Sequence, residues 1–205
     1  MSAPRIAVVD YGIGNLRSAE KALQHLDADA RLTSDVRTIE AAGAVVLPGV
    51  GAFGACMQAL RAGGLEGATK SAATDGRPFL GICIGMQMLF DGSDETPDVA
   101  GLGVVPGRVT LLPRTVRLPQ MGWNTLDVRA GSRLCGHLPD PAWLYFVHSF
   151  APEPECDGVV AAWCDYGRRF AAAVEDGPLW ATQFHPEKSG DVGMRMLRNF
   201  AEAVG

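Results

Sequence analysis

The stretch that decides the fold is Pro78-Phe79-Leu80-Gly81-Ile82-Cys83-Ile84-Gly85-Met86-Gln87-Met88-Leu89-Phe90. It begins with a short apolar run, which is typical of a buried β-strand. Gly81 and Gly85 flank Cys83 and lack side chains, so backbone segments can approach closely where the chain turns. The residues after the turn are compatible with a helix. This stretch therefore predicts a strand, a sharp turn and a helix, with a thiol at the turn.

Two further strand–helix units precede this stretch. Residues 6–9 (Ile-Ala-Val-Val) and 44–47 (Ala-Val-Val-Leu) are continuous apolar runs that predict buried strands. Such strands, with helices between them, are typical of a parallel sheet covered on both faces. Helical spacing follows both runs, at Ala19, Ala22, Leu23 and Leu26 and again at Met57 and Leu60.

The second half of the chain has a different pattern. Short β-prone runs alternate with turn residues, and Asp165-Tyr166-Gly167 is typical of a hairpin turn. An amphipathic helix over residues 192–204 closes the chain. We therefore expect one α/β domain over residues 1–205, with a flavodoxin-like, doubly wound, mostly parallel sheet and an antiparallel β extension in its second half. The strands expected there are residues 108–112, 143–150, 159–164, 170–174 and 179–184.

The composition is that of an ordinary globular protein, with 47% hydrophobic and 20% charged residues among 205. A net charge of −5 without a basic cluster argues against a nucleic-acid binder. Because no segment is typical of a signal peptide or a membrane-spanning helix, we expect a cytoplasmic protein without membrane contact. Five cysteines without a Cys-x-x-Cys pair favour reduced thiols over disulfides or a zinc site, and no metal or other cofactor is expected.

Cys83 is the first candidate for chemistry. The predicted strand, turn and helix around it resemble the nucleophile elbow of hydrolytic α/β enzymes, with Cys in place of Ser. A helix beginning at Ile84 would stabilise a thiolate through its N-terminal dipole. The alternative is that Cys83 is a small buried hydrophobic residue, as most cysteines are.

About a hundred residues later, His185-Pro186-Glu187 supplies an imidazole and a carboxylate. If this segment is extended, His185 and Glu187 project to the same side and can interact. Pro186 favours the end of a strand, where the active-site groups of open α/β sheets gather. With Cys83, these residues have the composition of a Cys-His-carboxylate triad. The alternative is an exposed His and Glu at a strand exit.

A glycine-rich turn and a second histidine complete the candidates. Pro48-Gly49-Val50-Gly51-Ala52-Phe53-Gly54 follows a predicted strand and can point backbone N–H groups at a developing oxyanion. The alternatives are a tight turn before a helix and a phosphate cradle. His148, at the end of a predicted strand, is expected to line a pocket, whereas His25 and His137 have no motif around them and are expected at the surface.

Taken together, these segments resemble the class I (triad) glutamine amidotransferases, with Cys83 in the nucleophile elbow and His185-Pro186-Glu187 as the second motif. Ile84 stands where Leu is more usual, and residues 91–94 are a variable approach to Glu95. The motif blocks follow the family's order over essentially the whole chain. Four blocks are similar to the glutaminase-subunit family of imidazole glycerol phosphate synthases: Asp10-Tyr11-Gly12-Ile13-Gly14-Asn15-Leu16-Arg17-Ser18, Pro48-Gly49-Val50-Gly51-Ala52-Phe53, Gln120-Met121-Gly122-Trp123-Asn124 and His185-Pro186-Glu187-Lys188-Ser189.

The resemblance implies glutamine hydrolysis and roles for particular residues. Cys83 would attack the side-chain carboxamide of L-glutamine, forming a γ-glutamyl thioester and expelling ammonia. His185 would deliver a proton to the leaving amine and then activate water, while Glu187 would hold its ring. The backbone N–H groups of Val50 and Ile84 would bind the oxyanion. The residues implied for the amino-acid end of glutamine are Gly51, Gln87, Glu95, Ser149 and Phe150.

The resemblance also implies a partner. The family's glutaminases form a heterodimer with a cyclase subunit, a (β/α)8 barrel that uses the ammonia to make imidazole glycerol phosphate and an aminoimidazole carboxamide ribotide in histidine biosynthesis. Ammonia released into water becomes ammonium and loses nucleophilicity, so the transfer needs an enclosed interface. The alternative for Met121 and Trp123 is a place in the core. The residues implied at the interface are Asn15, Met121, Trp123, Tyr145 and Lys188.

Other functions remain open at this point. A glutaminase subunit of another synthase, of the pyridoxal phosphate or anthranilate type, would share the triad. A flavodoxin-like protein with a redox-sensing Cys83, or a pure interaction module, would share the fold without glutamine turnover. If the partner gates the glutaminase, a backbone rearrangement at Gly49-Val50 is the switch that we expect, because glycine lets a peptide reorient at low cost.

Overall fold

A computed structural model describes residues 5–14 and 16–204 of the chain. In this part of the chain the main sheet has eight strands, in the order β2-β1-β3-β4-β13-β12-β11-β8. The first five are mutually parallel, and their order matches the 2-1-3-4-5 order of a flavodoxin-like sheet. The predicted doubly wound α/β fold is therefore confirmed. The parallel strands are β1 (Arg5–Val9), β2 (Asp29–Thr33), β3 (Ala44–Gly49), β4 (Phe79–Cys83) and β13 (Leu179–Thr182).

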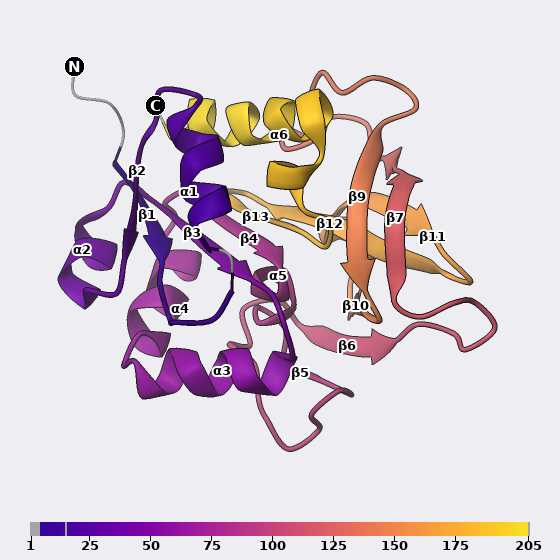
Figure 1. Cartoon of the computed structure of the whole chain (residues 1–205), viewed down its shortest axis with the longest axis horizontal. Coiled ribbons are helices and arrows are strands. Elements are labelled where there is room, and N and C mark those ends of the chain that lie inside the picture. The colour runs from indigo at the N-terminus through magenta and orange to yellow at the C-terminus, as the bar shows by residue number, and fades with distance from the viewer. Residues whose placement is uncertain (1–4, 15, 205) are drawn as a thin grey trace.

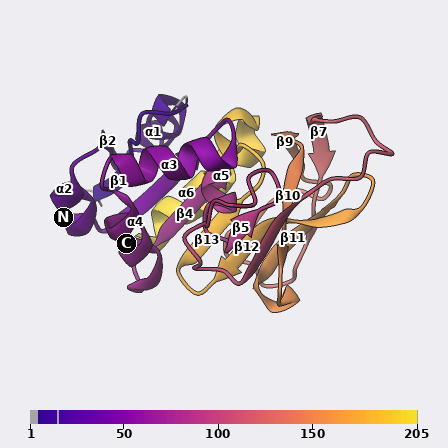
Figure 2. The ribbon, with the colours of Figure 1, turned by 90° about the horizontal axis from the view of Figure 1, so that it is seen from below.

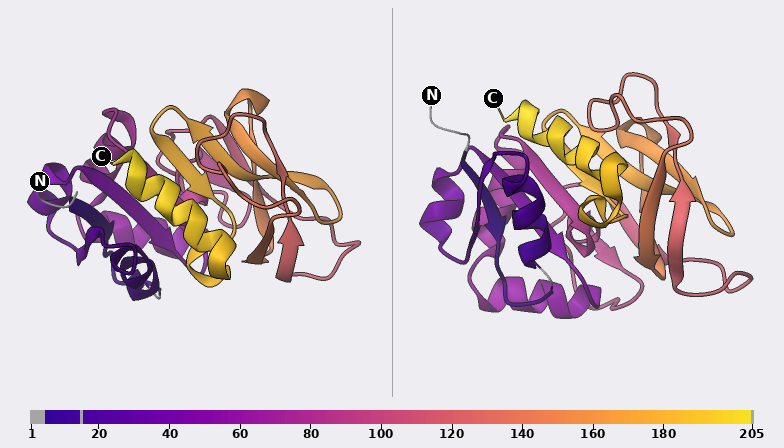
Figure 3. Two further views of the ribbon diagram at one scale, coloured as in Figure 1. Left: turned by 90° about the horizontal axis from the view of Figure 1, so that it is seen from above. Right: turned by 45° about the horizontal axis from the view of Figure 1, so that its top comes forward.

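The predicted antiparallel extension is also present. Strand β12 continues the main sheet beside β13, and β11 and β8 follow it, all antiparallel to their neighbours. Figures 2 and 3 show these strands at the end of the molecule away from α1 and α2. The added strands of the main sheet are β8 (Asp127–Val128), β11 (Val160–Asp165) and β12 (Arg169–Asp176); a smaller sheet has β5 (Gly92–Ser93), β6 (Gly107–Leu111) and β10 (Phe150–Pro154); and a two-stranded ribbon has β7 (Gln120–Thr125) and β9 (Trp143–His148).

Helices cover both faces of the parallel half of the sheet (Figure 1). Helices α1 and α6 contact each other on one face, while α3 and α4 lie on the other. Buried apolar side chains from both halves of the chain form one continuous core, from Ile6 to Phe200. The helices are α1 (Leu16–Gln24), α2 (Val36–Ala41), α3 (Phe53–Ala62), α4 (Glu66–Thr74), α5 (Ile84–Gln87) and α6 (Gly190–Ala203), with 3-10 turns η1 (Asp157–Val159) and η2 (Pro186–Lys188). None of the helices in the described ranges has the length and apolarity to cross a bilayer.

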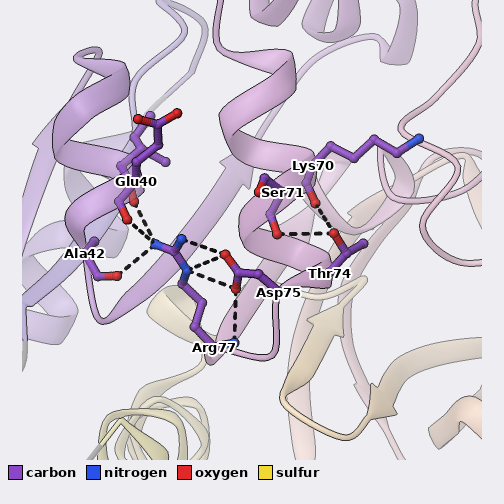
Figure 4. Close-up of polar contacts among 8 residues, drawn as sticks. Glu40, Ala42, Lys70, Ser71, Thr74, Asp75 and Arg77 are labelled. Atoms are coloured by element: carbon purple, nitrogen blue, oxygen red, sulfur yellow. Dashed lines mark hydrogen bonds and ion pairs between the residues drawn. The ribbon is translucent and has the colours of Figure 1, made fainter.

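Arg77, in the segment just before β4, links that segment to the end of α2 (Figure 4). Its guanidinium donates to the carbonyl oxygens of Ile39, Glu40 and Ala42, at 3.0, 3.0 and 2.8 Å, where α2 ends. The same group pairs with Asp75 at 2.6 Å and lowers the pKa of that carboxyl. The Ile39 carbonyl also accepts from the Ala42 N–H at 3.3 Å, so Arg77 adds to the cap of α2 and links the end of that helix to the segment before β4.

The structure corrects several details of the sequence-based expectations. The strand expected over residues 143–150 is two strands, β9 and β10, because the chain leaves the β7 ribbon at Ser149 and enters the smaller sheet. The expectations also missed β2, β5, β7, β8, α2 and α4. Strand β2 is an edge strand whose side chains are mostly half-buried or exposed, so it has no continuous apolar run.

Candidate active site

Cys83 lies at the sharp turn that the sequence predicts. It is the last residue of β4, and α5 begins at the next residue. Its φ of 56° and ψ of −111° are strained for a residue with a side chain, and such strain concentrates at functional sites. Gly85 makes the turn possible, because a Cβ there would lie 1.7 Å from the carbonyl oxygen of Leu47. The elbow is confirmed as a backbone structure.

The Cys83 turn forms part of the wall of a cavity of about 290 Å³. The cavity lies at the carboxyl ends of the parallel strands, where open α/β sheets bind ligands. It brings together two residues of the expected triad, both expected oxyanion residues and all five residues expected to bind the substrate. The lining residues are Val50, Gly51, Cys83, Ile84, Gln87, Glu95, Pro119, Val147, His148, Ser149, Phe150 and His185.

His185 and Glu187 interact, but not in the way that the sequence suggested. The Nδ1 atom of His185 lies 2.8 Å from Oε1 of Glu187, and both side chains are at least nine-tenths buried. The expectation of an extended segment was wrong, because Pro186–Lys188 forms the 3-10 turn η2. The turn, and not strand alternation, brings the carboxylate back to the imidazole. The expected alternative of an exposed His and Glu is also wrong.

The backbone of His185 is anchored to strand β9. Its N–H donates to the carbonyl oxygen of Tyr145 at 3.0 Å. The Ser189 hydroxyl donates to the His185 carbonyl oxygen at 2.6 Å and accepts from the Tyr145 N–H at 3.0 Å. Tyr145 and Ser189 therefore fix the backbone of His185, and Glu187 orients its imidazole.

The charge state of His185 suits a proton donor. Burial lowers its pKa, but interactions with Cys83 and Glu187 outweigh burial and raise the pKa to about 9. The ring is therefore mostly protonated at neutral pH. Its Nε2 atom makes no hydrogen bond with any residue that the structure describes. That atom is buried, and His185 lines the cavity together with Cys83.

The glycine-rich turn after β3 lies beside the nucleophile. Gly49 pairs with Cys83 across the sheet, and Val50 and Gly51 line the cavity. A Cβ at Gly49 would lie 2.9 Å from the Gly85 nitrogen, so the two turns are in close contact. The Tyr11 hydroxyl donates to the Pro48 carbonyl oxygen at 2.8 Å and fixes the start of the turn.

Two side chains that line the cavity, Gln87 and Glu95, offer oxygen acceptors. The Nε2 atom of Gln87 donates to the Phe150 carbonyl oxygen at 3.0 Å, and its Oε1 atom has no partner among the described residues. Glu95 is exposed, and its Oε2 atom accepts from the Phe53 N–H at 2.7 Å. Ser149 connects β9 to β10, and Phe150 is the first residue of β10.

His148 lines the cavity, as the sequence predicted. Its Nδ1 atom lies 2.8 Å from the Phe150 carbonyl oxygen, so this nitrogen carries the proton if the two are hydrogen-bonded. Burial lowers the pKa of His148 to about 4, so the ring is neutral at neutral pH.

Four of the five residues implied at a partner interface lie on or near the β7–β9 ribbon. Met121 and Trp123 are 66% and 54% exposed, so the alternative that they belong to the core is wrong. Trp123 pairs with Tyr145 across the ribbon, and their rings pack edge to face, 6.0 Å apart. Lys188 is exposed in η2, and Asn15 lies outside the described residues.

Three residues near the nucleophile were not identified from the sequence. Pro119 and Val147 line the cavity, and the side-chain nitrogen of Gln183 lies 3.7 Å from the Cys83 sulfur. The position of Gln183 after an apolar strand, two residues before His185, was a usable signal. A polar side chain is expected to face the site where a buried strand ends.

Comparison with known proteins shows the family of the chain. The chain matches the family described as "Glutamine amidotransferase class-I" over residues 7–204. It is 49% identical over 199 residues to "Imidazole glycerol phosphate synthase subunit HisH" of Methanothermobacter thermautotrophicus, covering 97% of this chain and 98% of that protein. The protein of the same name from Syntrophotalea carbinolica is 45% identical over 204 residues, covering 96% and 99%.

A solved structure described as "Crystal structure of glutamine amidotransferase" has the same fold, with a TM-score of 0.76. It is 23% identical and covers 97% of this chain and 98% of its own. The chain therefore belongs to the class-I glutamine amidotransferase family, and within it to the family of imidazole glycerol phosphate synthase subunits.

Proposed function

We propose that residues 1–205 act as one glutaminase domain that hydrolyses L-glutamine to glutamate and ammonia for imidazole glycerol phosphate synthesis in histidine biosynthesis. One observation carries the proposal. Cys83 at a strained turn and His185, paired with Glu187, line the same cavity of about 290 Å³. A nucleophile, a proton carrier and its orienting carboxylate in one pocket are the components of acyl transfer.

In the proposed mechanism, the Cys83 sulfur attacks the side-chain carbonyl carbon of glutamine. The carbon–nitrogen bond breaks as His185 gives its proton to the leaving nitrogen, which departs as ammonia and leaves a γ-glutamyl thioester. The raised pKa of His185 supports this role. His185 then takes a proton from water, the resulting hydroxide attacks the thioester, and the carbon–sulfur bond breaks to release glutamate. Glu187 holds the ring throughout.

The remaining cavity residues would bind the charges of the substrate. The backbone N–H groups of Val50 and Ile84 would donate to the oxyanion, a role supported by their places in the two turns that contact each other around Cys83. The acceptor oxygens of Gln87 and Glu95 suit the α-ammonium group of glutamine. Gly51 and the backbone of Ser149 and Phe150 would contact the rest of the amino-acid end.

The ammonia would pass to a cyclase subunit with a (β/α)8 barrel in a cytoplasmic heterodimer. The name of the two relatives, a subunit of imidazole glycerol phosphate synthase, supports such an assembly. Exposed apolar side chains on the β7–β9 ribbon, next to the site, support this ribbon as the surface that binds the cyclase. The residues proposed at the interface are Asn15, Met121, Trp123, Tyr145 and Lys188.

The test is glutamine hydrolysis by the chain with its cyclase partner. We expect Cys83→Ala to abolish turnover and Cys164→Ala, which removes a buried thiol outside the cavity, to retain it. Residual turnover of Cys83→Ala above about a thousandth of wild type would contradict the proposal, because loss of a nucleophile costs far more. A diazo-ketone analogue of glutamine should label Cys83 alone, and failure to label it would favour a redox or interaction protein.

A further inference from the structure

Gln183 is a buried polar residue at the end of β13 with no role in the function proposed so far. Its side chain is fully buried, and its backbone N–H donates to the Ala172 carbonyl oxygen at 2.8 Å. A buried amide without partners is costly, so the contacts of this side chain identify what the residue is placed to do.

Both ends of the Gln183 amide have partners in the active site. The Nε2 atom lies 3.7 Å from the Cys83 sulfur and is positioned to donate to it. The Oε1 atom accepts from Nε2 of Gln87 at 2.9 Å. Gln183 is not among the residues that line the cavity, so it contacts Cys83 from the protein interior.

The contact with Gln87 decides which way the Gln87 amide faces. Nε2 of Gln87 has two hydrogens, and its two acceptors are Gln183 Oε1 at 2.9 Å and the Phe150 carbonyl oxygen at 3.0 Å. With both hydrogens used, Gln87 can offer a ligand only its Oε1 atom, which has no partner in the described part of the chain. The amide of Gln183 thus fixes an acceptor at the cavity wall.

We propose that Gln183 is a positioning residue that donates to the Cys83 sulfur and orients Gln87 as an acceptor for the ammonium end of glutamine. This inference rests on the proposed function. A donor aimed at the sulfur favours the thiolate over the thiol, because hydrogen bonding to the charged form stabilises it. One side chain therefore links the nucleophile to the group that recognises the substrate.

The alternative is that Gln183 only fills space beside β13. Gln183→Met distinguishes the two, because methionine has similar length and no amide. Gln183→Glu keeps an oxygen acceptor for Gln87 but loses the N–H donor toward the sulfur. Thr182→Val is the matched control: Thr182 is the adjacent residue and equally buried, and among the described residues its hydroxyl hydrogen-bonds only to the Phe184 carbonyl oxygen.

Two measurements test the proposal. The first is the rate of Cys83 alkylation by iodoacetamide against pH, followed on the Cys83 peptide by mass spectrometry because Cys156 is exposed. The second is glutamine hydrolysis with the cyclase partner, separated into kcat and KM. Thermal unfolding of each variant reports folding. The alkylation measurement needs no turnover, so it tests Gln183 even if the proposed function fails.

We expect Gln183→Met to move the alkylation curve to higher pH, to slow alkylation near neutral pH by roughly tenfold, and to raise KM. Gln183→Glu should move the curve while leaving KM close to wild type, and Thr182→Val should change neither. Alkylation by Gln183→Met that coincides with wild type would overturn the donor role. An equal rise in KM in both Gln183 variants would overturn the link to Gln87. Equal shifts in Thr182→Val would show a packing effect and would also overturn the proposal.

Discussion

The α-carbon of Gly85 lies so close to Leu47 that a Cβ at this position would be 1.7 Å from the Leu47 carbonyl oxygen. Leu47 is a buried residue of β3, and Gly85 is the second residue of α5, so the contact holds the nucleophile turn against the sheet. Since the clash involves backbone, a side chain at this position cannot be accommodated by a change of rotamer.

Gly85→Ala should therefore destabilise the protein strongly. We expect a loss of roughly 3 kcal/mol or more in the free energy of unfolding, typical of severe backbone clashes in a core. Gly67→Ala is the control: Gly67 lies in α4, and a Cβ there would meet nothing within 4 Å. That change should be neutral or stabilising by up to about 1 kcal/mol. Urea unfolding measures both, and equal stability of the two variants would contradict the close approach.

Replacing Glu187 tests the origin of the raised pKa of His185. Glu187→Gln keeps the shape but removes the charge that helps to raise the His185 pKa to about 9. NMR titration of the imidazole should therefore show a lower midpoint in the variant, together with a fall in glutamine turnover of roughly 100-fold or more. Glu175→Gln, a change at a carboxylate outside the cavity, should leave the His185 midpoint unchanged. A His185 midpoint unaffected by loss of Glu187 would argue against the pair.

The two buried histidines make opposite contributions to the pH dependence of stability. The pKa of His148 is lowered to about 4, so its contribution is present above its unfolded pKa of 6.5 and is lost as pH falls toward 4. The raised pKa of His185 contributes stability below pH 6.5 that is lost as pH rises through about 9. We expect His148 alone to remove about 3 kcal/mol between pH 6.5 and 4, at 1.36 kcal/mol per pKa unit.

A His148→Phe variant isolates the contribution of His148 to the pH dependence of stability. Phenylalanine retains the aromatic packing against Phe146 and Phe170 but does not titrate. Its free energy of unfolding, measured by urea at several pH values, should fall less steeply than that of wild type below pH 6.5. Parallel curves for the two proteins would show that other groups control acid unfolding.

The elbow and the strands of the parallel sheet could be predicted because each produces a local pattern in the sequence. A continuous apolar run that ends at Gly81 and Cys83 specifies a buried strand and a turn within a few residues. Strand β2 was missed because an edge strand needs no such run, and α4 because its alanines, threonines and glycine give only a weak apolar face. The 3-10 turn at Pro186 was also missed, because the sequence does not distinguish it from a strand end.

The position of Gln183 after an apolar strand was a usable signal, but its contacts could not be predicted, for a different reason. Its partners Cys83 and Gln87 are about a hundred residues away, and only the pairing of β13 with β4 brings them together. The exposure of Met121 and Trp123 likewise depends on tertiary structure. No strand was expected over residues 120–125, and only the family resemblance implied a place at an interface; apolar residues are otherwise assigned to a core by default. Local patterns specify elements, and contacts between elements complete the site.

We expect the exposed face of the β7–β9 ribbon to contribute strongly to the free energy of binding between this chain and the cyclase subunit. Trp123→Ala removes a half-exposed indole that packs against Tyr145, and large aromatic side chains dominate interfaces. We expect the affinity for the cyclase subunit to fall by about 2 kcal/mol, or roughly 30-fold, in isothermal calorimetry.

Two controls separate this effect from a change in folding or in the active site. Val128→Ala, at an exposed apolar residue of β8 outside the ribbon, should bind the partner as wild type does. Alkylation of Cys83 in the isolated Trp123→Ala chain should match wild type, because Trp123 does not line the cavity. If both alanine variants bind the cyclase with wild-type affinity, the apolar face of the ribbon is not the docking surface, and its exposed tryptophan needs another explanation.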